Sequence, residues 1–267
     1  LKPESLSSSY PLSLFEDQSE TLWIGTYGGG LSSYSRYRSK FGVFKNDPLN
    51  PKSLSSNAIR SFYIDKSNTL WIGTRGGGLN KFDSEKGEFK AYKSVPNDNQ
   101  TLSSNEIYFI LEDELGFFWI GTSGGGLNKF DPKTGKSQSF QNDPLNANSL
   151  SNNFIYYLLD DKLGSIWAGT DGGGLNKFDK KTGKFTVYKN DPNDSLSISD
   201  NIIISIYNDK QGRLWLGTRS GGLNIFDPKT GNSVIYKNNP KDSNSIPNNS
   251  VLSIVEDAFG SIWIGTD

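Results

Sequence analysis

LWIGTRGGGLNKFD, residues 70–83, is the stretch that decides the fold, because close copies of it recur along the whole chain. Its tryptophan marks the copies, and successive tryptophans are 48 residues apart with no insertion or deletion between them. The six are Trp23, Trp71, Trp119, Trp167, Trp215 and Trp263. The chain is therefore an array of one repeat, and such a period outweighs any single local feature in predicting the fold.

One period contains four segments that we interpret as strands A to D. In the repeat that begins near Asn153 they span residues 154–159, 166–170, 175–179 and 184–188. Short turns that contain Gly or Asp separate the segments, and a longer polar stretch leads to the next strand A. No segment keeps a 3.6-residue apolar period over three turns, so helices are not expected.

Four antiparallel strands repeated every 40 to 50 residues are typical of a β-propeller. We therefore predict an all-β fold, with five full four-stranded blades and the first half of a sixth in a single, incomplete domain over 1–267. A β-sandwich is the alternative, although it does not require identical spacing in every unit. The predicted blades span about 10–48, 58–96, 106–144, 154–192, 202–240 and, in part, 250–267.

The tryptophan of strand B has two interpretations. A large ring at the middle of a strand can fill the gap between neighbouring sheets, and a glycine two residues later leaves room beside it. An exposed ring could instead stack on carbohydrate. Six copies at the same strand position favour the structural interpretation for Trp23, Trp71, Trp119, Trp167, Trp215 and Trp263.

Composition excludes several kinds of chemistry. The 267 residues contain no Cys and no His, so no thiol nucleophile, imidazole base or typical zinc site is available. The 28 Lys and Arg nearly balance the 29 Asp and Glu, which argues against electrostatic binding of nucleic acid or an anionic membrane. No apolar run is long enough to span a membrane. We expect no cofactor, and a chain that opens on Leu1 is expected to be a processed product or an excerpt.

Calcium was considered because an aspartate ends strand A in most repeats. Calcium takes six to eight oxygen ligands, whereas each turn offers one carboxylate, so we interpret these residues as turn caps and predict no metal site. They are Asp65, Asp113, Asp161, Asp209 and Asp257.

The stretch from Asp161 to Asp179, DKLGSIWAGTDGGGLNKFD, resembles the two-component regulator propeller repeat. The resemblance covers essentially the whole chain and combines D-x-x-G, W-I-G-T and G-G-L-N. It implies the extracytoplasmic sensor region of a bacterial hybrid two-component protein of the inner membrane, followed by a β-sandwich, a membrane span and a histidine kinase. It also implies that the ligand is an oligosaccharide. No kinase module lies within this chain, so kinase activity is expected outside it.

Both ends of the array depart from the repeat. In the first repeat, residues 35–40 replace the D-x-x-x-G hairpin, and atypical end units often cap repeat arrays. At the other end, Asp267 follows strand B of an ordinary repeat. We expect an excerpt of a longer propeller, completed by other propeller segments. A five-bladed ring with a surplus hairpin, and completion by a second chain, are the alternatives, since an unpaired strand favours association.

A ligand is expected on the face that carries the B-to-C turns and the D-to-A segments, which we call the top face. Two positions there vary in residue type between near-identical repeats: the residue after W-x-G-T and the second residue of strand A. Their aromatic, guanidinium and carboxylate groups suit a hydroxylated or anionic small molecule, although each could also be a solvated turn or strand residue. The candidates are Tyr27, Arg75, Ser123, Asp171 and Arg219 at the first position, and Arg60, Tyr108 and Tyr156 at the second.

Three functions remain open. A non-catalytic module that senses an oligosaccharide or similar polar ligand is the first, because loops on rigid scaffolds carry most binding sites. A protein-interaction scaffold would use the same top face. A propeller lyase or glycoside hydrolase is disfavoured, since there is no His and no carboxylate pair outside structural turns.

Overall fold

The computed structural model describes residues 6–35 and 40–267, and in those residues every regular element is a strand. The atypical hairpin expected at residues 35–40 has its centre, 36–39, outside the described residues. None of the described residues forms a helix that is long and apolar enough to cross a membrane. The chain divides into two compact units, Leu1–Ser139 and Phe140–Asp267, which are described in turn.

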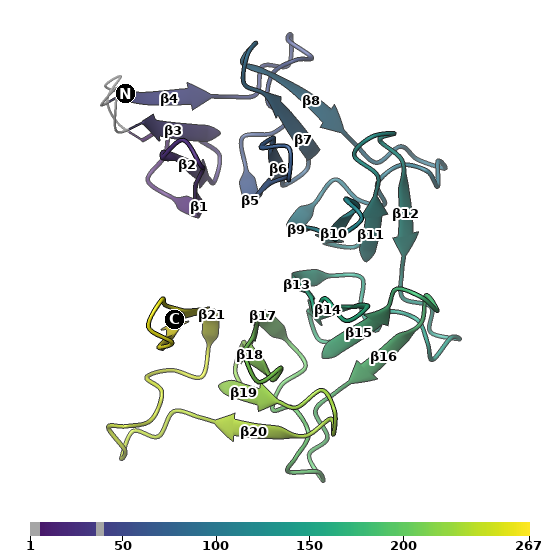
Figure 1. The fold of residues 1–267 in the computed structure, drawn as a ribbon, viewed down its shortest axis with the longest axis vertical. Coiled ribbons are helices and arrows are strands. Elements are labelled where there is room, and N and C mark those ends of the chain that lie inside the picture. The colour runs from purple at the N-terminus through teal and green to yellow at the C-terminus, as the bar shows by residue number, and fades with distance from the viewer. Residues whose placement is uncertain (1–5, 36–39) are drawn as a thin grey trace. The chain divides into compact units, whose positions relative to one another are not determined.

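The first unit contains three four-stranded antiparallel sheets, drawn from purple to teal in Figure 1. In each sheet the strands are neighbours in chain order, and the four strands correspond to A, B, C and D of one repeat. The strands are β1 (Pro11–Glu16), β2 (Thr21–Thr26), β3 (Leu31–Ser35), β4 (Lys40–Phe44), β5 (Ile59–Ile64), β6 (Leu70–Thr74), β7 (Gly78–Asp83), β8 (Glu88–Tyr92), β9 (Ile107–Glu112), β10 (Phe118–Thr122), β11 (Leu127–Phe130) and β12 (Ser137–Phe140).

The second unit contains two more four-stranded sheets and a terminal hairpin, drawn from green to yellow in Figure 1. Its strands are β13 (Ile155–Asp160), β14 (Ser165–Thr170), β15 (Leu175–Asp179), β16 (Phe185–Tyr188), β17 (Ile203–Asn208), β18 (Leu214–Thr218), β19 (Leu223–Phe226), β20 (Ser233–Tyr236), β21 (Val251–Glu256) and β22 (Ile262–Thr266). The predicted all-β propeller class, with five full blades and half of a sixth, is confirmed. The division into a single domain stays a prediction.

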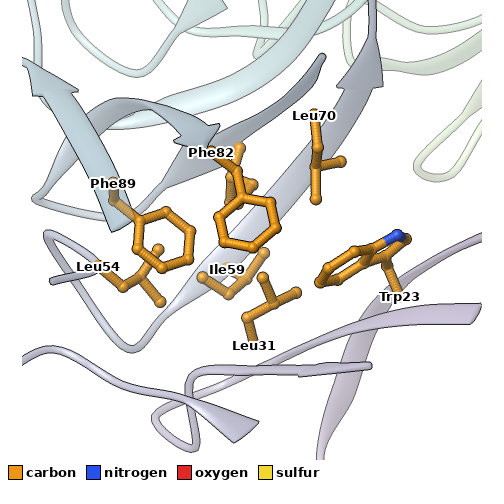
Figure 2. Packing of buried hydrophobic residues seen from close by; sticks show 8 residues of the cluster. Trp23, Leu31, Leu54, Ile59, Leu70, Phe82 and Phe89 are labelled. Atoms are coloured by element: carbon orange, nitrogen blue, oxygen red, sulfur yellow. The ribbon is translucent and has the colours of Figure 1, made fainter. Parts of the chain in front are cut away.

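Apolar side chains pack between successive blades, as Figure 2 shows for the first two. Trp23 of the first blade meets Phe82 of the second edge to face, with ring centroids 5.6 Å apart. Trp71 and Phe118 are related in the same way at 4.8 Å, with perpendicular rings. In the first unit a blade therefore buries one face against the next, which is why a single blade would not be stable alone.

Burial of the tryptophans differs between the repeats. Trp71, Trp119 and Trp167 are at most 2% exposed, and Trp23 is 8% exposed. Trp215 is only half-buried, because the hairpin β21–β22 that follows it lacks strands C and D. Trp263 is 63% exposed, since no described repeat follows it. Four of the six tryptophans are thus buried, and the structural role predicted for all six stays a prediction.

The glycine of W-x-G-T leaves room for a neighbouring blade rather than for the tryptophan. A Cβ on Gly73 would collide with Ser61 Oγ of the same blade and lie 2.6 Å from Ile107 Cγ2 of the next. Ile107 is fully buried in the cluster that also contains Trp71. Glycine is therefore required where strands A and B of one blade meet strand A of the next.

Candidate functional site

Backbone hydrogen bonds build the top face. The amides of Gly76 and Gly78 donate to the carbonyl of Asn105 at 3.1 and 3.0 Å, which joins a B-to-C turn to the D-to-A segment that follows the blade. Both glycines have positive φ, 80° and 77°, as a tight turn at this position requires. Gly172 and Gly174 bond to Asn201 in the same way in the second unit. The predicted sharing of one face by these two kinds of segment is confirmed within each unit.

The second residue of strand A lies at a β-bulge in every repeat. In the second blade, Ile59 pairs with Thr74 and Ser61 pairs with Gly73, so Arg60 is the extra residue between two consecutive pairs. The same irregularity occurs at Tyr108 and at Tyr156. Bulges redirect side chains and are frequent beside binding sites. The variable second residue of strand A is therefore one that the regular pairing of strands A and B does not fix.

The first group of candidate residues lies in the first unit and centres on Arg75. Its Nη1 donates to the hydroxyl of Tyr27 at 3.3 Å, and its guanidinium carbon is 6.0 Å from the centroid of the same ring. Its Nε lies 3.6 Å from a carboxylate oxygen of Glu106. Arg75 and Tyr27 both remain about half exposed. These side chains present an aromatic ring, a cation and a carboxylate together at the surface.

A second group in the same unit pairs the two bulge residues Arg60 and Tyr108. The guanidinium carbon of Arg60 lies 4.9 Å from the ring centroid of Tyr108, within the range of a cation–π interaction. The Nε of Arg60 is buried and donates no hydrogen bond within the described residues. The guanidinium of Arg60 thus contacts the face of the Tyr108 ring.

The second unit repeats this chemistry with different members. Arg219 Nη2 donates to the hydroxyl of Tyr156 at 2.7 Å, and the guanidinium carbon is 5.6 Å from the ring centroid. The ring of Phe154 lies 4.5 Å from that of Tyr156. An arginine from one blade therefore meets a tyrosine from its neighbour in both units.

Ser123 and Asp171 lie at the expected turn position, directly after W-x-G-T. Their amides donate to the carbonyls of Glu106 and Phe154 at 3.0 Å, as the equivalent amide does in every repeat. Both side chains are half-buried. They border the pairs through the backbone, and their part in a site stays a prediction.

Sequence reasoning missed Glu106, the partner of Arg75. Its position, immediately before strand A, also varies in type between repeats: the residues there are Tyr10, Ala58, Glu106, Phe154, Ile202 and Ser250. The criterion that found the other candidates could therefore have found this one. The carbonyl at this position bonds the amide of the residue after W-x-G-T, which brings the two variable positions together.

Sequence reasoning also missed the partner of the repeated aspartates on the opposite, bottom face. Asp65 Oδ1 accepts the amides of Ser67 and Thr69 at 2.9 Å, so the predicted turn cap is confirmed. Its Oδ2 accepts the indole Nε1 of Trp71 at 2.8 Å. The corresponding indole hydrogen bond occurs in all six repeats, at 2.7 to 3.3 Å. These carboxylates are thus occupied by the turn and the ring.

On the bottom face, two contacts between neighbouring blades raise the pKa of a tyrosine. The hydroxyl of Tyr63 lies 3.5 Å from Glu112 of the next blade, and burial together with that carboxylate raises the pKa of Tyr63 to about 12. Tyr207 donates to Glu256 in the same way, and this hydrogen bond raises the pKa of Tyr207 to about 12. Phenols held in the neutral form cannot act as bases at neutral pH. Among the described residues, no group of three or more acidic side chains could hold a metal ion.

Six segments of the chain match the family model of the two component regulator propeller: 5–28, 53–76, 101–124, 149–172, 197–220 and 245–267. Together they cover more than half of the residues, so the chain belongs to this family. Each match runs from the D-to-A segment through strands A and B to the turn that carries the variable residues. A comparison with curated proteins found no match.

Several solved structures share the fold. The chain aligns over 98% of its length with 39% of the extracellular domain described for the hybrid two component system BT3049 of B. thetaiotaomicron, at 23% identity and a TM-score of 0.65. PorZ, a surface component of the type-IX secretion system of Porphyromonas gingivalis, aligns at 17% identity and a TM-score of 0.71, over 95% of this chain and 37% of PorZ. Virginiamycin B lyase from Staphylococcus aureus aligns at 15% identity and a TM-score of 0.69, over 96% of this chain and 78% of the lyase. The chain thus spans well under half the length of the BT3049 domain and of PorZ.

Proposed function

We propose that this chain is a non-catalytic ligand-sensing module of a two-component signalling protein, and that its top face recognises an oligosaccharide or similar small polar ligand. The observation that carries the proposal is the meeting of arginine and tyrosine from neighbouring blades in both units. These are the positions at which near-identical repeats differ, so the scaffold does not require these side chains.

The chemistry of the pairs suits a hydroxylated ligand. Tyrosine rings offer an apolar face with a hydrogen-bonding tip, and guanidinium groups donate to hydroxyl or carboxylate oxygens. Arg75 uses one nitrogen on Tyr27 and another beside Glu106, which leaves further donors at an exposed surface. Most of the framework needed to orient these groups is already formed, which lowers the entropy cost of binding.

The location and output of the protein belong to the same proposal. The family is one of regulators, and the aligned domain of BT3049 is described as extracellular. Both support an extracytoplasmic position, with any kinase in another part of a longer protein. The regulator family also supports a non-catalytic role, although the fold is shared with a lyase.

Isothermal titration calorimetry against a panel of oligosaccharides tests the proposal. We expect heat of binding without turnover for at least one member of the panel. In the double variant Arg75→Ala with Tyr108→Ala, binding should be lost while the melting temperature is unchanged, because both side chains lie at partly exposed positions. Lys133→Ala, an exposed residue in a C-to-D turn on the bottom face of the same unit, is the control and should bind normally.

The other functions give different results in the same assay. Turnover of a glycan would indicate an enzyme, and silence across the panel would leave the protein-interaction scaffold. Unaltered binding in the double variant would show that the ligand does not use this part of the top face.

A further inference from the structure

A cavity of about 670 Å³ lies between the fourth and fifth blades, on the bottom face of the second unit. Strands β13–β16 form the fourth blade and β17–β20 the fifth (Figure 1). The lining includes Trp167 of the fourth blade and both bottom turns of the fifth, the A-to-B turn and the C-to-D turn. Ligand sites commonly occupy roughly 300 to 1,000 Å³, so the cavity is large enough for a few residues of a peptide. The structure describes every residue of this unit.

Positive charge predominates in the lining of this cavity. Its cationic side chains are those of Lys177, Lys210, Arg213 and Lys229, and its carboxylates are those of Asp161 and Asp227. Both carboxylates already accept hydrogen bonds from the turns that they close. Four cations against two carboxylates leave an excess of two positive charges. The cavity therefore favours an anionic ligand.

Two of the cations have donors left for such a ligand. The Nε of Arg213 donates to Asp209 Oδ2 at 2.8 Å, and the two terminal nitrogens of Arg213 donate no hydrogen bond within the described residues. Lys229 forms no ion pair within residues 6–35 and 40–267. Lys210, by contrast, is paired with Glu256 at 2.8 Å. Arg213 and Lys229 are therefore the groups best placed to bind a carboxylate.

The charge of the cavity depends on two positions at which the fifth repeat differs from the others. Two residues before the tryptophan, the successive repeats have Thr21, Thr69, Phe117, Ser165, Arg213 and Ser261. At the last residue of strand A, they have Glu16, Ile64, Glu112, Asp160, Asn208 and Glu256. The fifth repeat alone has a cation at the first position, and it has a neutral amide at the second, where four repeats have a carboxylate.

Asn208 also has a buried atom without a partner. Its Oδ1 is buried and accepts no hydrogen bond within the described residues, and Asn208 lines the cavity. In the third repeat the equivalent Glu112 lies 3.5 Å from the hydroxyl of Tyr63 in the preceding blade. The fourth blade has Leu159 at the position of that tyrosine and supplies no such donor. A buried oxygen without a donor costs free energy, which a ligand with an N–H group would recover.

From these features we infer that the Asn208 cavity binds an acidic peptide. Carboxylate side chains of the peptide would pair with Arg213 and Lys229, and a backbone N–H would donate to Asn208 Oδ1. Methylene groups of the same side chains would contact Pro228 and Leu163, which is 90% exposed. The site lies on the bottom face and contains none of the residues placed in the top-face pairs.

Isothermal titration calorimetry with tetraglutamate that carries acetyl and amide caps tests the inference, and capped tetraglutamine is the neutral control. Peptide concentrations up to about 10 mM detect a Kd near 1 mM. We expect only tetraglutamate to bind. The affinity should fall as salt is added, because ion pairs at exposed positions are screened. The same peptide with free ends distinguishes the source of the ligand: tighter binding of the capped form indicates an internal segment of a partner chain, and tighter binding of the uncapped form a free peptide.

Two lysines at equivalent turn positions give a matched pair of variants. Lys229→Ala should weaken binding of tetraglutamate by about tenfold, the effect of losing one charged hydrogen bond. Lys181→Ala removes the equivalent lysine of the fourth blade, which is exposed and outside the lining, and should leave the affinity unchanged.

Two further variants copy residues of other repeats, so they should fold. Arg213→Ser copies Ser165 and Ser261, and Asn208→Asp restores the carboxylate of Asp160 at a nearly identical size. Each should weaken binding by at least about tenfold, by loss of a cation or by repulsion of the peptide. Thermal melting of each variant confirms that it is folded.

Several results would overturn the inference. Absence of heat with tetraglutamate in both its capped and uncapped forms is one, and unchanged affinity in folded Lys229→Ala and Arg213→Ser is another. Citrate has three carboxylates but no N–H group, so citrate binding as tight as that of tetraglutamate would show a site for anions in general. Tighter binding of octathymidylate would assign the cavity to nucleic acid instead. The double variant Arg75→Ala with Tyr108→Ala should bind tetraglutamate normally, which separates this site from the top face.

Discussion

Asp113 and Trp119 are joined by a hydrogen bond of 2.9 Å from the indole Nε1 to the carboxylate Oδ2. The other carboxylate oxygen accepts the amides of Leu115 and Phe117, both at 3.0 Å. Asp113 is 2% exposed, as is Trp119. One aspartate therefore closes the turn between strands A and B and also fixes the buried ring of strand B.

Removal of this carboxylate should destabilise the fold. Asp113→Ala leaves an indole and two amides without their acceptor, and we expect a cost of about 2 to 3 kcal/mol in the free energy of unfolding. In a Trp119→Phe background, which keeps an aromatic ring without the donor, the cost should be smaller. Urea denaturation of the four proteins measures this coupling. Equal costs in the two backgrounds would show that the indole bond contributes nothing.

The stability should fall in acid because two aspartates at the equivalent position, Asp209 and Asp257, have lowered pKa values. The indole of Trp263 and the amide of Ser261 hydrogen-bond Asp257 and lower its pKa below 3.8. Burial would raise the pKa of Asp209, but hydrogen bonds from Trp215 and Arg213 outweigh it, and that pKa is lowered as well. Stability from a lowered pKa is present above the unfolded value and is lost as the pH falls through the folded value.

Thermal unfolding from pH 7 down to acid measures this dependence. The melting temperature should hold until the pH approaches 3.8 and then decrease. The difference between wild type and Asp209→Asn should shrink over the same range, because a protonated Asp209 is also neutral. A difference that stayed constant through acid would contradict the assignment.

Trp71 and Trp263 should respond oppositely to truncation. Trp71 is fully buried between Phe118 and Phe130, whereas Trp263 is 63% exposed. We expect Trp71→Ala to cost about 3 to 5 kcal/mol and Trp263→Ala less than about 1 kcal/mol. Chemical denaturation compares them directly, and similar costs would show that the blade interface does not depend on the ring.

Glu20 offers a substitution that should stabilise the fold. It adopts φ 58° in the turn between strands A and B, where later repeats have Gly116, Gly164, Gly212 and Gly260 with positive φ. Glu20→Gly should remove this strain and gain about 0.5 to 1 kcal/mol after the entropy of glycine is counted. Glu85→Gly, at a turn residue without positive φ, is the control and should be neutral or destabilising. A loss of melting temperature in Glu20→Gly would show that the turn is not strained.

The fold could be predicted because one sequence motif recurs in every repeat. Spacing of Trp71 from its copies sets the period, and strand patterns between them define the blade. Exposure of Trp263 was not predictable by the same reasoning, because burial of one repeat depends on the residues of the next. The indole hydrogen bond of Asp65 also needed coordinates, since six residues of sequence separate the partners and a turn decides whether they meet.

Candidate residues could be selected from the sequence, but the partners of their side chains could not. Differences in residue type among equivalent positions identified Arg60, Tyr108 and Arg75. Their partners depend on the bulge in strand A and on contact between successive blades, which the sequence pattern of one repeat does not contain. Glu106 was missed because the position before strand A was not compared between repeats.

Amide hydrogen exchange with and without a bound oligosaccharide shows whether a ligand binds through the top-face pairs. We expect slower exchange in peptides that contain the bulge at Arg60 and Tyr108 and the glycine turn after Arg75. Peptides from the exposed outer strand β20 serve as the internal reference and should be unchanged. Protection of the top-face peptides that disappears in Arg75→Ala with Tyr108→Ala is the predicted result. A ligand that binds while these peptides exchange as fast as in the free protein would contradict the account.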